Sequence, residues 1–174
     1  MIFYPGGINF EESEKVGSTW KGMTSMPKTK WSELSHMQLG QYGEYYAKME
    51  FTSYGFDVYT SEVDDHGVDF IAKKDGIFYE VQVKSIRNDN YMFIRKSKIV
   101  LDDKHLICYL RFVDSQLPEV YVIPATVFLE PDGSLFTSKD YVGLKSDPEY
   151  GINLSKKNYE KMQAYRIEAT IQTL

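Results

Sequence analysis

Three polar side chains in the middle of the chain are spaced so that a β-hairpin would bring them together. The dipeptide Asp75-Gly76 is the strongest short signal for a two-residue hairpin turn, because both turn positions require a positive φ. With that turn, Asp69 lies directly opposite Gln82, and Lys84 is its diagonal neighbour on the same face. A carboxylate, an amide oxygen and an ammonium group on one patch of sheet are suited to holding a divalent cation beside a phosphate.

The side chains of the second hairpin strand alternate between an apolar face and a mostly polar face, which is the pattern of a half-buried strand. The apolar face carries Ile77, Tyr79, Val81 and Val83, and the other face carries Phe78, Glu80, Gln82 and Lys84. A slip of one residue in this register would separate Asp69 from Gln82. The candidate site therefore depends on the turn, and a different turn would leave an unrelated α/β interaction protein as the alternative.

Composition narrows the class of protein. The 174 residues suggest one domain with a substantial core, and 43% hydrophobic with 26% charged residues is ordinary for a soluble globular chain. No apolar run approaches the ~20 residues of a membrane span, and the first residues lack the features of a signal peptide, so we expect a cytoplasmic protein without a membrane partner.

The single cysteine, Cys108, is expected to be a buried filler. Without a CxxC pair or a glycine-rich phosphate loop, we expect neither a zinc site nor a small-molecule cofactor.

Charge is unevenly distributed along the chain. The net charge is −5, yet residues 73–111 hold nine basic and five acidic side chains. This stretch begins at the hairpin and continues through Arg87, Arg95, Lys96 and Lys98. A local positive surface can guide a polyanion while the rest of the protein repels it. Such a stretch is equally well a solvated face, so both interpretations stay open.

The chain divides into an extension over residues 1–34, which packs either on the domain or on a partner subunit, and a domain over residues 35–174. The domain starts with a predicted helix. Ser35 and Gln38 form a capping-box pattern, and Gly55 is placed to end the helix.

This helix has an apolar stripe and a second face of small residues. The stripe is Leu39, Tyr42, Tyr46 and Met49, and the small face is Gly40, Gly43 and Ala47. Glycine costs about 1 kcal/mol in a helix interior, so the small face indicates close approach to another backbone, such as a sheet. Glu44 lies at the margin of the small face and could point along that sheet toward its edge.

The remaining pattern predicts a mixed α/β fold with a central sheet. The order is helix, three strands, a connecting region, two strands and a helix. In the connecting region, residues 91–98 alternate as a strand would, although a helix over 95–103 fits as well. Outside the hairpin, the expected strands cover 56–60, 106–113 and 120–123, and the last helix runs from Ser155, its N-cap, to Ala169.

Three segments in this order resemble the signature of the PD-(D/E)XK nuclease superfamily: Gly43-Glu44 on a helix, Gly67-Val-Asp69, and Val81-Gln-Val-Lys84. The resemblance covers roughly residues 35–170. It implies the restriction-endonuclease-like fold, a central mixed sheet flanked by helices. It also implies metal-dependent hydrolysis of DNA phosphodiester bonds, and a homodimer, because duplex cleavage needs two sites.

The resemblance assigns roles to individual residues. Mg²⁺ or Mn²⁺ would be held by Asp69 as the principal ligand, by the side-chain oxygen of Gln82 and by the main-chain carbonyl of Val83. Glu44 would be an outer ligand, and Lys84 would orient or deprotonate the attacking water or neutralise charge on the phosphate.

Gln82 departs from the signature, because the superfamily usually has Asp or Glu at this position. An amide oxygen is a weaker ligand for a hard cation than a carboxylate, so we expect lower metal affinity. Glu80, on the same face, is a further candidate ligand. The departure also leaves open a second function, a catalytically inactive module that binds nucleic acid or a protein partner.

Overall fold

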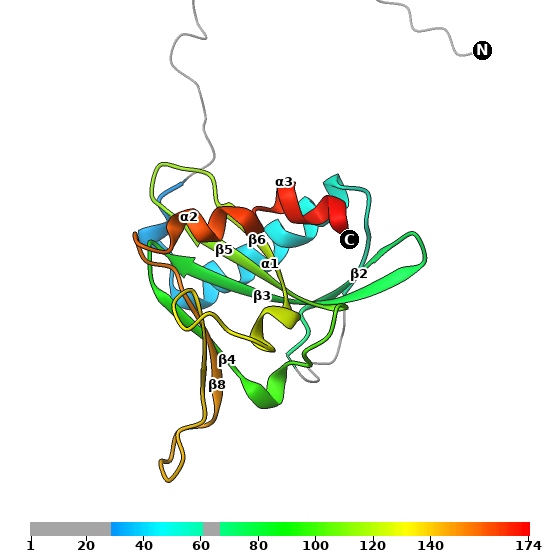
Figure 1. The fold of residues 1–174 in the computed structure, drawn as a ribbon. Helices are drawn as coiled ribbons and strands as arrows, with labels where there is room; N and C mark the ends of the chain where they lie inside the picture. The colour runs from blue at the N-terminus through cyan, green and yellow to red at the C-terminus, as the bar shows by residue number, and fades with distance from the viewer. Residues whose placement is uncertain (1–28, 61–66) are drawn as a thin grey trace, which may run out of the picture.

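The computed structural model describes residues 29–60 and 67–174, so most of the predicted extension lies outside the described residues. A central sheet contains β1 (Asp57–Thr60), β2 (Phe70–Lys74), β3 (Ile77–Arg87), β5 (His105–Phe112) and β6 (Glu119–Pro124). These strands lie in the order β1-β2-β3-β5-β6, and Figure 1 labels β2, β3, β5 and β6 of this sheet. The pairing of β3 with β5 is parallel and the others are antiparallel. The predicted mixed α/β class with a central mixed sheet is confirmed.

The hairpin has the predicted turn and register. Asp75 and Gly76 both have positive φ, 51° and 83°, as a two-residue hairpin of this twist requires. Phe70 pairs with Val81 across the hairpin. The pairing ends at Phe70, and the Asp69 N–H donates to the Val81 carbonyl, so Asp69 does not continue the regular register that would set it directly opposite Gln82.

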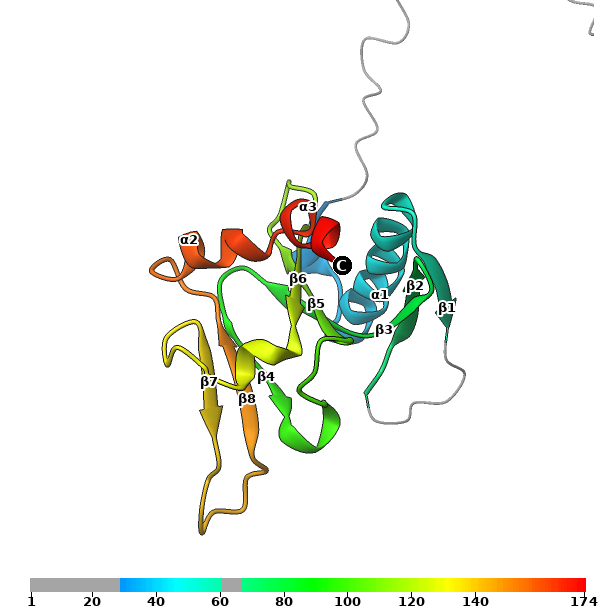
Figure 2. The same ribbon diagram turned by 45° about the vertical axis from the view of Figure 1, so that its right-hand side comes forward.

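A second, antiparallel sheet lies beside the first, with β4 (Tyr91–Arg95), β8 (Glu149–Asn153) and β7 (Phe136–Lys139) in that order (Figure 2). The strand interpretation of residues 91–98 is right for β4, and only a short 3-10 helix, η3 (Lys96–Lys98), follows it. Strands β7 and β8 were not expected from the sequence.

Helix α1 (His36–Ser53) begins and ends where the sequence predicts. The Ser35 hydroxyl accepts the Gln38 N–H while the Gln38 side chain accepts the Ser35 N–H, which completes the capping box. Gly55, with φ of 84°, follows the helix end. Within the described residues, no helix is both long and apolar enough to cross a membrane.

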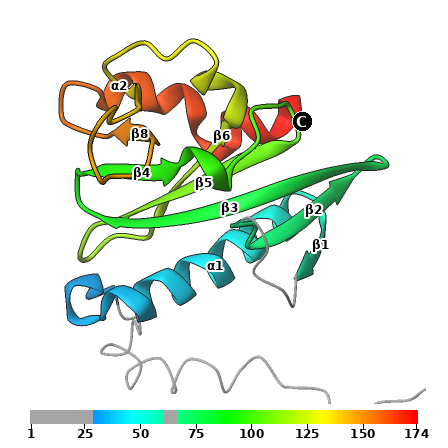
Figure 3. The ribbon, with the colours of Figure 1, turned by 90° about the horizontal axis from the view of Figure 1, so that it is seen from below.

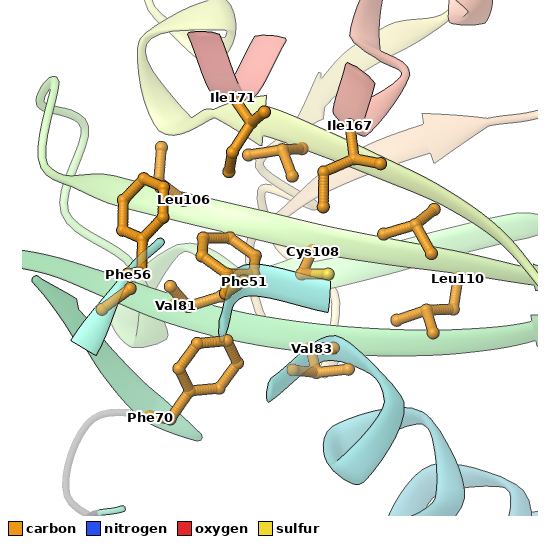
Figure 4. Close-up of a cluster of buried hydrophobic side chains, with 14 of the residues drawn as sticks. Phe51, Phe56, Phe70, Val81, Val83, Leu106, Cys108, Leu110, Ile167 and Ile171 are labelled. Atoms are coloured by element: carbon orange, nitrogen blue, oxygen red, sulfur yellow. The ribbon is translucent and has the colours of Figure 1, made fainter. Parts of the chain in front are cut away.

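Hydrophobic cores lie on both faces of the central sheet. Figure 3 shows α1 on one side of β3, with β4, β8 and α2 (Tyr159–Met162) on the other. The first core lies on the α1 side and includes Phe51, Phe70, Val81 and Leu110, which Figure 4 shows together with Cys108. Cys108 is fully buried, as expected of a filler. The second core lies under β4, β8 and α2.

The expected single C-terminal helix is wrong. It is replaced by short helical segments: α2, η5 (Gln163–Tyr165), α3 (Ile167–Thr170) and η6 (Ile171–Thr173). Met162 packs in the second core and Ile167 in the first, so the chain must pass from one face of the sheet to the other. Arg166 makes the break with extended backbone, and it bridges to Tyr121 on the edge strand β6. The expected N-cap also shifts, since Asn158, not Ser155, precedes α2.

Helix α1 docks through its small face, where Gly43 and Ala47 are buried with Leu39 and Phe51. The predicted stripe does not face the sheet as a whole, because Met49 at its end is 61% exposed. A side chain on Gly43 would overlap the Ser85 hydroxyl of β3. Gly43 is thus the point of closest approach between helix and sheet.

Alanine at two glycines of α1 should change stability in opposite directions. Gly43→Ala should lower the free energy of unfolding by about 1–3 kcal/mol, because the new Cβ overpacks against Ser85. At Gly40 no described atom lies within 4 Å of an added Cβ, so Gly40→Ala should raise it by up to about 1 kcal/mol. Urea denaturation measures both changes. The pair Gly43→Ala with Ser85→Ala should recover part of the loss, and a Gly43→Ala protein as stable as wild type would contradict this account of the docking.

Candidate active site

Asp69 lies immediately before β2, at the point where β3 continues without a β2 partner. Its N–H donates to the Val81 carbonyl at 2.9 Å. Its carboxylate Oδ2 accepts the Val83 N–H at 2.6 Å. In a strand the N–H and C=O of one residue point the same way, so the Val83 carbonyl also projects toward this open edge. The structure therefore brings the Asp69 carboxylate and the Val83 main chain together.

Gln82 is buried, with 9% of its surface exposed. Its Oε1 atom is buried and has no hydrogen-bond partner among the described residues. An oxygen left in this state costs free energy on the order of 1–3 kcal/mol. The amide nitrogen lies against Gly67, where an added Cβ would be only 2.5 Å from Nε2. Gly67 was not singled out by side-chain reasoning, and its φ of +83° is a second reason for glycine there.

Glu44 reaches the same region from α1. Burial, and then the nearby Asp69 carboxylate, raise the pKa of Glu44, whereas the ammonium groups of Lys48 and Lys84 oppose that rise. The pKa of Glu44 therefore responds to both Asp69 and Lys84, while the role of Glu44 as an outer ligand stays a prediction. Lys48, one turn beyond Glu44, was not anticipated, although the spacing of a Glu–Lys pair on a helix face could have indicated it.

Lys84 is half-buried on β3, in register with Tyr109 of the parallel strand β5. The Tyr109 hydroxyl is buried without a hydrogen-bond partner among the described residues. Burial raises the pKa of Tyr109 far above its ordinary range, so this side chain stays neutral. Lys84 therefore borders a low-polarity part of the second core on one side and the carboxylates on the other.

Glu80 lies away from this group. Its carboxylate is 2.9 Å from His105 Nε2, and His105 Nδ1 is 2.6 Å from Asp102. Glu80 therefore contacts His105 at the start of β5. Asp64, Asp65 and His66 lie outside the described residues.

The four basic residues of the predicted stretch are placed differently from one another. The Arg87 guanidinium donates to the main-chain carbonyls of Trp31 and Leu34, and so fastens the 3-10 turn η2 (Trp31–Glu33) to β3. Trp31 itself is buried, with its Nε1 donating to the Gln116 carbonyl at 2.9 Å.

Arg95 and Lys96 form ion pairs with the loop between β7 and β8, at 3.3 Å to Asp147 and 2.5 Å to Asp140. Lys98 is exposed, and its main-chain carbonyl lies 3.5 Å from where a Cβ on Gly67 would stand. Lys98 and Gln82 therefore both lie against Gly67.

The oxygen atoms of the candidate site suit a hard divalent cation, although few of them belong to carboxylates. Within residues 29–60 and 67–174, no group of three or more His, Cys, Asp and Glu side chains is placed to hold a metal. Asp69 and Glu44 provide carboxylates, while Gln82 and the Val83 main chain provide neutral oxygens. Oxygen ligands of these kinds fit Mg²⁺ or Mn²⁺. The buried Gln82 oxygen without a partner supports this fit, because a cation would satisfy it.

Comparison with solved structures finds nucleases of similar fold, two of which are described here. A bacterial homing endonuclease, I-Ssp6803I, is 18% identical with a TM-score of 0.49, covering 80% of this chain and 93% of that one. The Holliday junction resolvase Hjc of Archaeoglobus fulgidus is 9% identical with a TM-score of 0.42, covering 70% and 88%. No protein-family model and no curated protein matches the sequence. At these identities and TM-scores, the two likenesses carry no argument about the chemistry of the site.

Glu44→Gln should stabilise the metal-free protein at neutral pH. A carboxyl whose pKa is raised in the folded state favours folding only while protonated, and that contribution is lost as the pH rises through the raised pKa. Glutamine at position 44 cannot ionise, so the variant keeps the stability that wild type loses as Glu44 becomes charged. Its Tm should therefore be higher by about 1 °C or more at pH ~7 and unchanged near pH ~4. Thermal unfolding with a metal chelator measures both. Glu130→Gln, which removes an exposed loop charge, is the control. A Tm for Glu44→Gln at or below wild type at neutral pH would contradict the assignment.

Proposed function

We propose that this protein hydrolyses DNA phosphodiester bonds with a divalent metal ion bound between β2, β3 and α1. One observation carries the proposal: Gln82, whose buried side-chain oxygen has no described partner, directly precedes Val83, whose N–H binds the Asp69 carboxylate. A protein interior rarely leaves such an atom unsatisfied, so its position indicates a ligand. Burial, and then the Asp69 carboxylate, raise the pKa of Glu44, and a bound cation would relieve the repulsion between these two carboxylates.

Asp69, Gln82 and the Val83 carbonyl would hold the metal, with Glu44 as an outer ligand. When bound, Mg²⁺ or Mn²⁺ supplies Lewis-acid stabilisation of the phosphate and a more acidic water. The Val83 N–H fixes the Asp69 carboxylate at 2.6 Å, which orients its second oxygen before any ligand arrives. The chain therefore contributes a partly preorganised oxygen site.

Lys84 is the cationic member of the proposed site. The pKa of Glu44 is raised by burial and by Asp69, and the ammonium groups of Lys48 and Lys84 partly oppose that rise. Lys84 would orient or deprotonate a water, or neutralise the negative charge that develops on a phosphate. Lys98, exposed beside Gly67, would contact the DNA backbone. Arg87 serves the fold instead, through its bonds to Trp31 and Leu34.

DNA is proposed as the substrate because the three signature segments resemble DNA nucleases. A homodimer would place two such sites on the two strands of a duplex. The alternative function, a module that binds nucleic acid without cleaving it, draws its support from the amide at position 82.

Asp69→Ala and Lys84→Ala should each reduce cleavage by at least about a hundredfold. The measurement is nicking of supercoiled plasmid, with four-way junction and single-stranded DNA as further substrates, in Mg²⁺ or Mn²⁺. Asp103→Ala and Lys104→Ala, exposed residues near the start of β5, are matched controls that should cleave like wild type.

The outcomes separate the two functions. Cleavage that both site variants retain would place the active site elsewhere. A wild-type protein that binds DNA but leaves every substrate intact would establish the inactive module instead. Wild-type protein that neither cleaves nor binds would end both proposals.

Gln82→Glu should strengthen metal binding and weaken the metal-free fold. A carboxylate is the stronger ligand, so the Mg²⁺ concentration for half-maximal nicking should fall roughly tenfold or more. Without metal, a third carboxylate beside Asp69 and Glu44 at a position 9% exposed should lower Tm, and Mg²⁺ should restore it. Thermal unfolding during a Mg²⁺ titration measures both effects, with the exposed Gln116→Glu as control. A Mg²⁺ dependence equal to that of wild type would remove Gln82 from the ligand set.

A further inference from the structure

The His105 imidazole lies between two carboxylates that belong to different parts of the fold. Its Nδ1 atom is 2.6 Å from Oδ1 of Asp102, in the segment that joins η3 to β5. Its Nε2 atom is 2.9 Å from Oε2 of Glu80 on β3. The His105 side chain is 17% exposed, whereas those of Asp102 and Glu80 are 42% and 45% exposed. One ring therefore fastens the connecting segment to β3.

Only a protonated ring can make both contacts as hydrogen bonds. A neutral imidazole has one N–H and one lone pair, and an ionised carboxylate can only accept. A neutral His105 ring would therefore turn its lone pair toward one of the two carboxylates. The hydrogen bond with His105 is also the first cause of the lowered pKa of Asp102. Histidine ordinarily changes its charge between pH ~5 and ~8, so this pair of contacts is sensitive to pH in that range.

The main chain around His105 depends on the same groups. Asp102 Oδ1 accepts the N–H groups of Lys104 and His105, both at 2.9 Å. The Glu80 N–H donates to the Lys104 carbonyl at 2.8 Å. Glu80 and His105 are also partners in the parallel register of β3 and β5. Loss of a ring contact would therefore weaken the hold on these three main-chain hydrogen bonds.

The other charged groups of this region favour a proton on the ring. His105 lines an open pocket together with further titratable groups, which are Tyr79 and Glu80 of β3, Asp102, Asp103 and Lys104 of the turn, and the end of the chain at Leu174. The residues that complete the lining are uncharged. Burial raises the pKa of Tyr79, which keeps this phenol neutral. Three carboxylate side chains against one ammonium group stabilise a cationic imidazole.

We infer that His105 is a pH-sensitive clamp, which holds residues 99–104 against β3 while its ring is protonated and releases them as the pH rises. This inference does not depend on the proposed function. The 3-10 helix η3, which precedes this segment, places Lys98 against Gly67. The clamp therefore acts on the connection that links β5 to the candidate active site.

The clamp has an acid limit as well as a basic one, because it needs an imidazolium and ionised carboxylates together. The lowered pKa of Asp102 keeps that carboxylate ionised into the acid range. The stabilisation is therefore largest near pH ~5.5, is lost as the ring deprotonates at higher pH, and falls again as carboxylates are protonated below pH ~4.

Amide hydrogen exchange followed by NMR measures the release without metal or DNA. The reporters are the N–H groups of Glu80, Lys104 and His105, and Leu110 in the same strand as His105 is the reference. Between pH ~5.5 and ~8, protection corrected for the intrinsic exchange rate should fall about tenfold at the reporters, the effect of one charged hydrogen bond, and stay constant at Leu110. The midpoint should coincide with the titration of the His105 ring in its nitrogen resonances.

Glu80→Gln separates the clamp from other effects of pH. The glutamine NH₂ can donate to a neutral Nε2 while Nδ1–H still donates to Asp102, so this variant should keep its protection at pH ~8. Asp103→Asn removes an exposed carboxylate of the same turn and is the matched control. It should show the pH dependence of wild type.

Three results would overturn the inference. One is reporter protection that does not change with pH in wild type. Another is a Glu80→Gln protein that loses protection as wild type does. The third is a midpoint that differs from the titration of the His105 ring, because another group would then be responsible. None of them bears on DNA cleavage, so the proposed function is judged by its own experiment.

Discussion

The register of the β2–β3 hairpin is the constraint on which the rest of the site depends. The Asp75-Gly76 turn sets the pairing, and the pairing decides that Asp69 arrives beside the Val83 N–H. A shift of one residue would reverse which side chains face each core, so burial of Phe70 and Val81 enforces the same register. The contact between Asp69 and β3 is therefore a consequence of core packing and turn chemistry acting together.

Docking of α1 supplies the second requirement, a carboxylate from outside the hairpin. The absence of a side chain at Gly43 lets the helix approach Ser85 closely, and this fixes the rotation of the helix about its axis. Glu44 is the next residue. Its pKa is raised by burial and by Asp69, and Lys84 opposes that rise.

Local signals made the hairpin and the capped helix predictable from sequence, and the candidate site stays a prediction built on them. Turn residues, a capping box and strict alternation act over a few residues and leave little freedom. The second sheet was missed because the pairing of β4 with β8 joins segments far apart in the chain. The split of the last helix was missed for a similar reason, since Met162 and Ile167 belong to cores on opposite faces of the sheet. The isolation of the Gln82 oxygen depends on three-dimensional burial, which no spacing reveals.

The amide at position 82 has opposite effects on stability and on metal affinity. Burial and then Asp69 already raise the pKa of Glu44, so the two carboxylates repel each other in the metal-free protein. A carboxylate at position 82 would add to that repulsion in a place 9% exposed, whereas an amide leaves only one unsatisfied oxygen. Compared with a carboxylate, glutamine at position 82 would also give the proposed ligand set one negative charge less and so attract a cation more weakly. If the proposed metal site is right, glutamine at position 82 would let the protein tolerate the absence of metal better than an all-carboxylate site, and the site would need a higher metal concentration to fill.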